Sequence, residues 1–221
     1  MKKKSLFVVG GIIILTVFIA VIVFVLNGGK DENNVGSEFD FSGTWMVYQY
    51  AENKIDNEIM VFSDNKVADY RDGNAESYLE STYTYEDGTL KLTDISKEFV
   101  VKVISENNIY LVEPDTREWK LVKIAEEGKE VIKITSSDLI GKYKVISVAG
   151  EKKENEIVDF SEDKFVDTRN GEVYLECAYE IIGENLINVV DISKEYYVYK
   201  NNDFLILVDK ADRYVWEMTI Q

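Results

Sequence analysis

The sequence contains no histidine, one cysteine and one proline. Without histidine there can be no Ser-His-Asp or Cys-His catalytic arrangement and no imidazole zinc site, and the commonest general base is missing. Its one cysteine, Cys177, can form neither an intrachain disulfide nor a cysteine-cluster metal site, and we expect it to be a buried strand residue. Stability must therefore come from packing.

Several catalytic motifs are also missing. The sequence has no G-x-S-x-G elbow, no phosphate-binding G-x-x-x-x-G-K and no dinucleotide-binding G-x-G-x-x-G. Two S-x-x-K patterns, 63–66 and 161–164, fall on predicted hairpin turns, whereas that chemistry places Ser and Lys one helical turn apart, so a plain turn is favoured. We predict a protein that is not an enzyme, with no catalytic, cofactor-binding or metal-binding residues; the sequence does not identify ligand-binding residues.

One long hydrophobic run stands at the N-terminus. Residues 6–26 carry no charge, and a helix of that length measures roughly 31 Å, enough to cross a bilayer core. A cleaved signal peptide is the alternative, but the run exceeds a usual h-region and no A-x-A-like cleavage site follows it. We predict a cytoplasmic tail over 1–5, a transmembrane helix over 6–26 and a linker over 27–38.

Charge sets the orientation. Lys2, Lys3 and Lys4 precede the run, and the positive-inside rule keeps them in the cytoplasm, so the rest of the chain is expected outside it, at the cell membrane. Beyond the run the chain has 22 basic residues and all 41 acidic ones, which gives this part a formal charge of −19. Such a surface disfavours nucleic acid and favours cationic partners or solubility. The expected partners are the membrane and a protein or envelope component.

The remainder consists of two copies of one repeat. Residues 41–45 align with 139–143, and 57–63 align with 155–161, both at an offset of 98. Further matches are Lys66/Lys164, Asp69/Asp167, Arg71/Arg169, Gly73/Gly171, 78–80/174–176, 94–99/191–196 and Trp119/Trp216. A period this long repeats a whole domain and not a solenoid unit, so we predict one domain over 39–124, a linker over 125–136 and a second domain over 137–221.

Within a copy the apolar residues alternate with polar ones, and turn signals such as Asp-Asn and Asp-Gly recur closely. Short turns join antiparallel neighbours, and eight such strands close naturally into a barrel. The fold class is therefore all-β: two tandem antiparallel meander barrels of about eight short strands each, after one transmembrane helix. In the first copy the strands are expected at 43–50, 57–63, 66–71, 77–85, 89–93, 97–105, 108–113 and 117–124. No amphipathic helix is expected after the anchor, 131–135 could add a strand, and 215–220 should be a surface strand with one wet face.

Gly43-Thr44-Trp45 at the start of a meander barrel resembles the G-x-W signature of lipocalins, and residues 62–66 with the later Trp119 resemble small lipocalin-like domains of bacterial surface proteins. The second copy has Tyr143 in place of the Trp. The resemblance implies a barrel, a basic residue packed over that Trp, for which Arg117 and Arg213 are the candidates, and in large members an internal apolar site. Each copy is about half a lipocalin, so we expect side chains to fill the interior and a deep cavity to be absent. Those side chains are Trp45, Val47, Phe62, Leu111, Trp119 and Leu121.

Two local features allow more than one interpretation. The identical runs 94–98 and 191–195 suggest a shared recognition loop or, more simply, a turn in which Asp and Ser bond nearby N–H groups. The loop 69–76 suggests weak calcium binding or solvated charge, and its spacing is not that of a dedicated site. We expect the whole chain to be a membrane-anchored extracytoplasmic binding module of unknown ligand, or alternatively a structural spacer at the cell envelope.

Overall fold

A computed structural model describes residues 39–201 and 203–221. The helices among these residues are single turns, and none of them could span a membrane. The predicted tail, transmembrane helix and linker over 1–38 lie outside the described residues.

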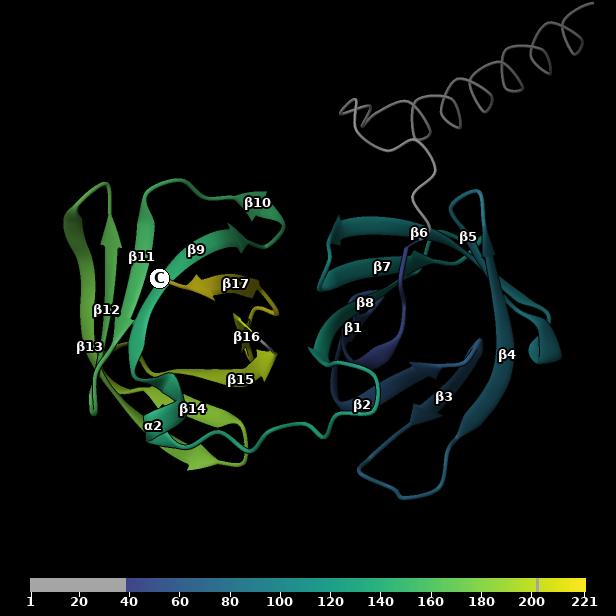
Figure 1. Cartoon of the computed structure of the whole chain (residues 1–221), viewed down its shortest axis with the longest axis horizontal. Coiled ribbons are helices and arrows are strands. Elements are labelled where there is room, and N and C mark those ends of the chain that lie inside the picture. The colour runs from purple at the N-terminus through teal and green to yellow at the C-terminus, as the bar shows by residue number, and fades with distance from the viewer. Residues whose placement is uncertain (1–38, 202) are drawn as a thin grey trace, which may run out of the picture. The chain divides into compact units, whose positions relative to one another are not determined.

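The first repeat is a closed antiparallel barrel in which each strand pairs with the next and β8 pairs back with β1 (Figure 1). Two of the predicted strands, 43–50 and 97–105, are confirmed at both ends, and the others differ by at most four residues at either end. The strands are β1 (Gly43–Tyr50), β2 (Asn53–Ser63), β3 (Lys66–Tyr70), β4 (Leu79–Glu86), β5 (Thr89–Leu92), β6 (Lys97–Ser105), β7 (Asn108–Val112) and β8 (Glu118–Ala125).

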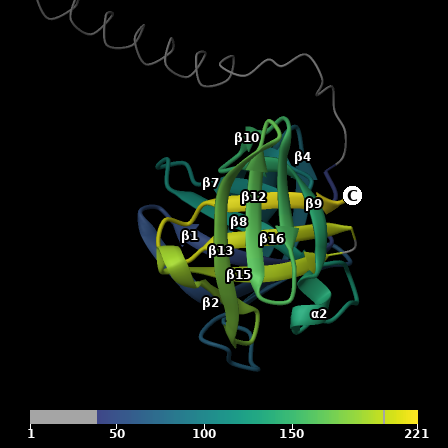
Figure 2. The same ribbon diagram turned by 90° about the vertical axis from the view of Figure 1, so that its left-hand side faces the viewer.

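The second repeat builds the same meander, closed by β17 pairing with β9 (Figure 2). A two-residue strand, β10, adds a hairpin to β9, so this sheet has nine strands. The strands are β9 (Gly141–Val148), β10 (Glu151–Lys152), β11 (Glu156–Phe160), β12 (Lys164–Arg169), β13 (Glu172–Gly183), β14 (Leu186–Val189), β15 (Lys194–Asn201), β16 (Phe204–Asp209) and β17 (Val215–Ile220).

The predicted turn residues adopt the backbone that tight hairpins need. Asp64 and Asn65, between β2 and β3, both have positive φ, as do Asp87 and Gly88 between β4 and β5. Asn and Asp tolerate this left-handed region better than other side chains, and Gly adopts it without strain. Turn chemistry visible in the sequence therefore fixes where the strands reverse.

Gly43 is the glycine of the G-x-W pattern, and its backbone explains why a side chain is excluded there. Its φ is +124°, and a Cβ on it would lie 2.6 Å from the carbonyl oxygen of Ala125. Two residues on, Trp45 is fully buried, and its Nε1 donates to the carbonyl of Phe41 at 2.7 Å. The pattern thus begins β1 and fixes the Trp at one end of the barrel.

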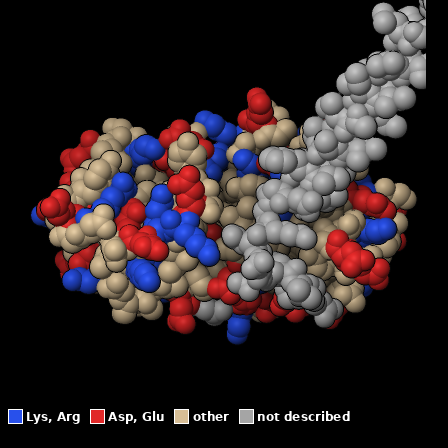
Figure 3. Space-filling model, turned by 90° about the horizontal axis from the view of Figure 1, so that it is seen from above, with Lys and Arg blue, Asp and Glu red and all other residues tan. Residues whose placement is uncertain are grey.

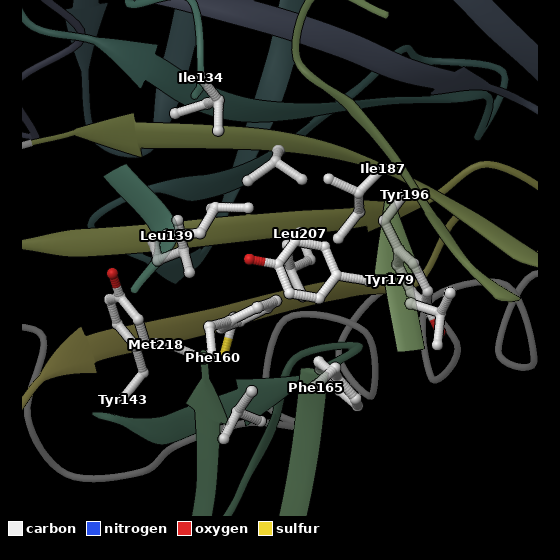
Figure 4. Close-up of a cluster of buried hydrophobic side chains, with 14 of the residues drawn as sticks. Ile134, Leu139, Tyr143, Phe160, Phe165, Tyr179, Ile187, Tyr196, Leu207 and Met218 are labelled. Atoms are coloured by element: carbon white, nitrogen blue, oxygen red, sulfur yellow. The ribbon is translucent and has the colours of Figure 1, made fainter. Parts of the chain in front are cut away.

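That end of each barrel is closed by aromatic and aliphatic side chains. In barrel 1 the ring of Phe41 packs against Phe62, Tyr83 and Tyr85 at centroid distances of 5.5, 5.9 and 5.0 Å. In barrel 2 Leu139 takes the position of Phe41. Figure 4 shows it with the labelled side chains of the same core, which are Ile134, Tyr143, Phe160, Phe165, Tyr179, Ile187, Tyr196, Leu207 and Met218.

The segment between the barrels differs from the prediction in two ways. A one-turn helix, α2 (Ser136–Leu139), is present, with a capping box between Thr135 and Asp138. Residues 131–135 form no strand, because Ile134 inserts its side chain into the barrel 2 core. The segment is therefore partly docked.

A third apolar cluster joins the outer faces of the two barrels. Strands β1 and β8 contribute Met46, Tyr48, Val122 and Ile124, and strands β16 and β17 contribute Ile206, Val208 and Val215. The prediction that β17 has a wet face is wrong, because Glu217 on that face is 1% exposed. It accepts hydrogen bonds from Ser147 in its own barrel and Ser105 in barrel 1.

Polar contacts also link the barrels. Asp56, on β2, accepts a hydrogen bond from the Tyr197 hydroxyl at 2.9 Å and pairs with the guanidinium of Arg213. Residues 40–221 consequently form one compact unit. On the face shown in Figure 3, acidic and basic side chains are interspersed, so the excess of acid is not gathered there into one patch.

Candidate functional site

The open end of barrel 1 is the candidate site. It lies opposite the end that Phe41 closes, where β1 and β3 end and β2, β6 and β8 begin. A pocket of about 520 Å³ occupies this end. Its lining residues are Tyr50, Ile55, Glu58, Met60, Asp69, Arg71, Tyr78, Leu79, Leu92, Ile95, Lys97, Phe99 and Trp119.

The barrel interior below the pocket is filled. All six side chains expected to occupy it are buried, and five of them are at most 1% exposed. The sixth, Trp119, is 8% exposed and lines the pocket. The expectation of a filled interior is confirmed for the middle of the barrel, and the pocket is confined to its mouth.

The mouth contains two buried carboxyl groups and one guanidinium. Asp69, on β3, is 2% exposed, and its Oδ2 accepts hydrogen bonds from Arg71 Nε at 3.0 Å and Nη2 at 2.8 Å. Glu58, on β2, is 7% exposed, and its Oε1 lies 3.4 Å from Arg71 Nη2. The Arg71 guanidinium stacks on the Tyr78 ring at 3.9 Å, so the loop that follows β3 helps to hold Arg71 in place.

The protonation of these acids follows from their surroundings. Burial and the neighbouring Asp69 raise the pKa of Glu58 to about 7, and Arg71 offsets this only in part. Burial also raises the pKa of Asp69, again against the opposing effect of Arg71. A carboxyl group that titrates near neutral pH therefore lies in the mouth of the barrel.

A second charged group stands on the other side of the mouth. The Glu113 carboxylate accepts a hydrogen bond from Trp119 Nε1 at 3.0 Å and pairs with Lys97 at 3.2 Å and Arg117 at 2.7 Å. These contacts fix the Trp119 indole as one wall of the pocket. Tyr50 packs against it, with 4.5 Å between the ring centroids.

Barrel 2 repeats the charged groups but not the rim. Arg169 pairs with Asp167 at 2.8 Å and Glu156 at 3.2 Å and stacks on Tyr174 at 3.7 Å, and Lys194 pairs with Asp209. Leu79 and Trp119 recur as Leu175 and Trp216, whereas Tyr50, Ile55 and Phe99 are replaced by Val148, Lys153 and Tyr196. The two mouths therefore share acids and differ in their apolar lining.

The basic residue expected over Trp45 is a different one. Arg117 lies over the Tyr50 ring and Arg213 over the Tyr197 ring, so neither candidate is correct. The buried Lys123 on β8 has its Nζ 5.3 Å from the Trp45 ring centroid. In barrel 2 the residue facing Tyr143 in the strand pairing is Ile220, so the Trp and its cation are replaced together.

The other features singled out from the sequence are structural in form. Ser63 and Lys66 pair across a hairpin, which confirms the turn. Asp94 accepts a bond from the Thr82 backbone N–H at 2.6 Å, and Asp191 one from Ala178 at 2.9 Å, while Ser96 and Ser193 adopt positive φ. Cys177 is buried on β13, as predicted. Nowhere in 39–201 or 203–221 do three or more acids or cysteines gather as metal ligands, so the loop 69–76 has no such cluster.

Sequence reasoning proposed no site residues and so missed the mouth. A signal was present, since Asp69 and Arg71 recur in register as Asp167 and Arg169, and Glu58 recurs as Glu156. Strand alternation from Phe62 also places Glu58 on the inward face, but it does not show that this end of the barrel is open. We found no match among family models, curated proteins or solved structures.

Proposed function

We propose that this chain is a noncatalytic binding protein that takes up a ligand at the mouth of barrel 1. The supporting observation is the pocket of about 520 Å³, which has four aromatic walls and a small number of charged groups. Ligand sites are typically concave, largely apolar and equipped with a few fixed polar groups. A helix over 6–26 would hold the barrels at a membrane, outside the cytoplasm, on the strength of its uncharged run and the lysines before it.

The test blocks the mouth without touching the core. Ile95 lies on the rim, so Ile95→Trp should fill the pocket, and its counterpart Ile192→Trp in barrel 2 is the matched control. The full chain in phosphatidylcholine nanodiscs would be titrated with 2-phenylethanol, with empty nanodiscs as the blank. We expect saturable one-to-one binding that Ile95→Trp weakens at least tenfold and Ile192→Trp leaves unchanged. Equal binding by all three chains would rule out the mouth as the site.

A structural spacer is the second candidate, and the joint between the barrels favours it. The shared apolar cluster and the Asp56 contacts restrict movement of one barrel against the other. A rigid tandem is the property that a spacer needs. Absence of any ligand at the mouth, together with an intact fold, would favour the spacer.

A further inference from the structure

Two oxygen atoms in the mouth of barrel 1 lack hydrogen-bond donors. Glu58 Oε1 and Asp69 Oδ1 are buried, and neither accepts a hydrogen bond. A buried carboxylate oxygen without a donor is costly, and native proteins seldom leave one so. Both residues line the pocket, so a molecule bound there lies next to them.

The charges of the mouth are unbalanced at the same place. Arg71 is the only cation paired with Glu58 and Asp69 among the described residues. Lys97 pairs with Glu113 on the other side and acts on Asp69 only as a longer-range charge that lowers its pKa. With both acids ionised, two carboxylates therefore share one guanidinium, and the position beside Arg71 favours a second positive charge.

The apolar walls also suit a cation with an organic body. Trp119, Tyr50, Phe99 and Tyr78 surround the pocket and offer an apolar body a large contact area. The formal charge of −19 beyond the N-terminal run favours the approach of cationic ligands over anionic ones.

From these observations, and resting on the proposed binding function, we infer that barrel 1 binds an organic cation. The ligand carries an ammonium or guanidinium group that is attracted by the charge of Glu58 and Asp69, joined to an apolar body that packs against Trp119 and Tyr50. Such a group occurs on small amines and on the basic side chains of peptides.

A purely structural role for the acids is the competing explanation. Barrel 2 has the same Glu-Asp-Arg set, and there too one buried oxygen of Glu156 and one of Asp167 accept no hydrogen bond. There, however, Val148 and Lys153 replace Tyr50 and Ile55 of the rim. Lys153 also lowers the pKa of Glu156, so barrel 2 supplies a control within the same chain that has the same acids, an added cation and a different rim.

The first experiment compares two probes of one shape. Phenethylammonium and neutral 2-phenylethanol would be titrated calorimetrically, up to about 10 mM, into the full chain in phosphatidylcholine nanodiscs. The ammonium should bind about tenfold tighter, because charge-assisted hydrogen bonds are the stronger ones. Equal affinities for the two probes would overturn the cation inference and leave the binding function standing. If neither probe binds, both the cation inference and the proposed binding function are overturned.

The second experiment locates the cation. Glu58→Gln keeps the shape of the side chain and leaves Asp69 to hold Arg71, so the fold should survive, as circular dichroism would verify. It should weaken phenethylammonium binding about tenfold without affecting 2-phenylethanol, and Glu156→Gln should change neither. If Glu58→Gln binds phenethylammonium as tightly as the parent chain, the cation does not lie beside Glu58. An equal loss of affinity in Glu156→Gln would also contradict a site confined to barrel 1.

A third comparison distinguishes the two sources of the cation. Acetyl-phenylalanyl-lysine amide and its Nε-acetylated form would be titrated in the same way. Tighter binding of the lysine peptide than of phenethylammonium would support a peptide ligand, and the reverse a small amine. Equal binding of the two peptide forms would overturn the inference for peptides.

Discussion

Glu58 illustrates how a single residue can couple the stability of this barrel to pH. Its carboxyl group is shielded from water beside Asp69, and its pKa is raised to about 7. The folded chain therefore holds this proton more tightly than the unfolded chain, where a Glu titrates near 4.5. The associated stability is fully present below the unfolded pKa and is lost as the pH rises through the folded pKa.

We expect Glu58→Gln to remove this dependence. Relative to the parent chain, the variant should gain about 1–3 kcal/mol in unfolding free energy between pH 5 and pH 8, because it has no charge to bury at the higher pH. Urea unfolding at several pH values measures the difference. The exposed Glu98→Gln should show no such trend, and a constant offset for Glu58→Gln would disprove the burial argument.

Gly43 sets a backbone limit at the start of barrel 1. Gly43→Ala should destabilise the chain by about 3 kcal/mol, because the residue has φ +124° and its new Cβ would lie 2.6 Å from a backbone oxygen. Gly73→Ala, at φ +69° with no atom within 4 Å of the Cβ, should cost only about 1 kcal/mol. Thermal unfolding of both variants tests the ranking, and equal losses would refute it.

At the scale of elements, the two repeats place the same short turn after β5 and β14. Residues 93–95 and 190–192 form 3₁₀ turns ending in a left-handed Ser, and the Asp of each accepts a backbone N–H from the neighbouring strand. The turn reverses the chain between β5 and β6 in the first copy and between β14 and β15 in the second. Identity of the two runs is therefore explained by backbone geometry.

The short helix α2 is held by one side chain. Leu139 is fully buried in the barrel 2 core, whereas the next residue, Ile140, is 46% exposed. Leu139→Ala should cost about 2–4 kcal/mol in unfolding free energy, because it leaves a cavity at the closed end, and Ile140→Ala should cost under about 0.5 kcal/mol. Chemical denaturation compares them, and similar losses would mean that α2 is not docked.

For the described unit as a whole, the joint between the barrels decides whether they unfold together. Ile206 is fully buried in the cluster that joins the two outer faces. A charge placed there cannot be hydrated unless the barrels separate. The joint is therefore the point at which a single substitution can uncouple the two domains.

We expect the parent chain to unfold in one calorimetric transition and Ile206→Asp to unfold in two. Ile220→Asp, on the adjacent strand at a 52% exposed position, should keep the single transition. Two transitions in the parent chain would show that the joint contributes little to stability. A single transition in Ile206→Asp would show that the barrels remain coupled without the apolar cluster.

The sequence by itself determined the repeat, the strand positions and the meander. These depend on local signals: period-two alternation locates the strands, and Asp, Asn and Gly in left-handed turns locate the reversals. Phe62 and Leu111 were predicted inside barrel 1 for that reason, and they lie there. The predicted membrane helix and lipocalin resemblance remain predictions.

Only the tertiary structure decided which outward faces are covered and which acids are buried. Alternation gives each strand two faces but does not say that a second barrel will pack on one of them, so Glu217 was expected in water and lies in the joint. Likewise the β2–β3 hairpin brings Glu58 and Asp69 together with Arg71, but only the closed barrel buries these acids. The residues that bury these acids are distant in the chain, and a local sequence pattern does not show which distant residues will pack together.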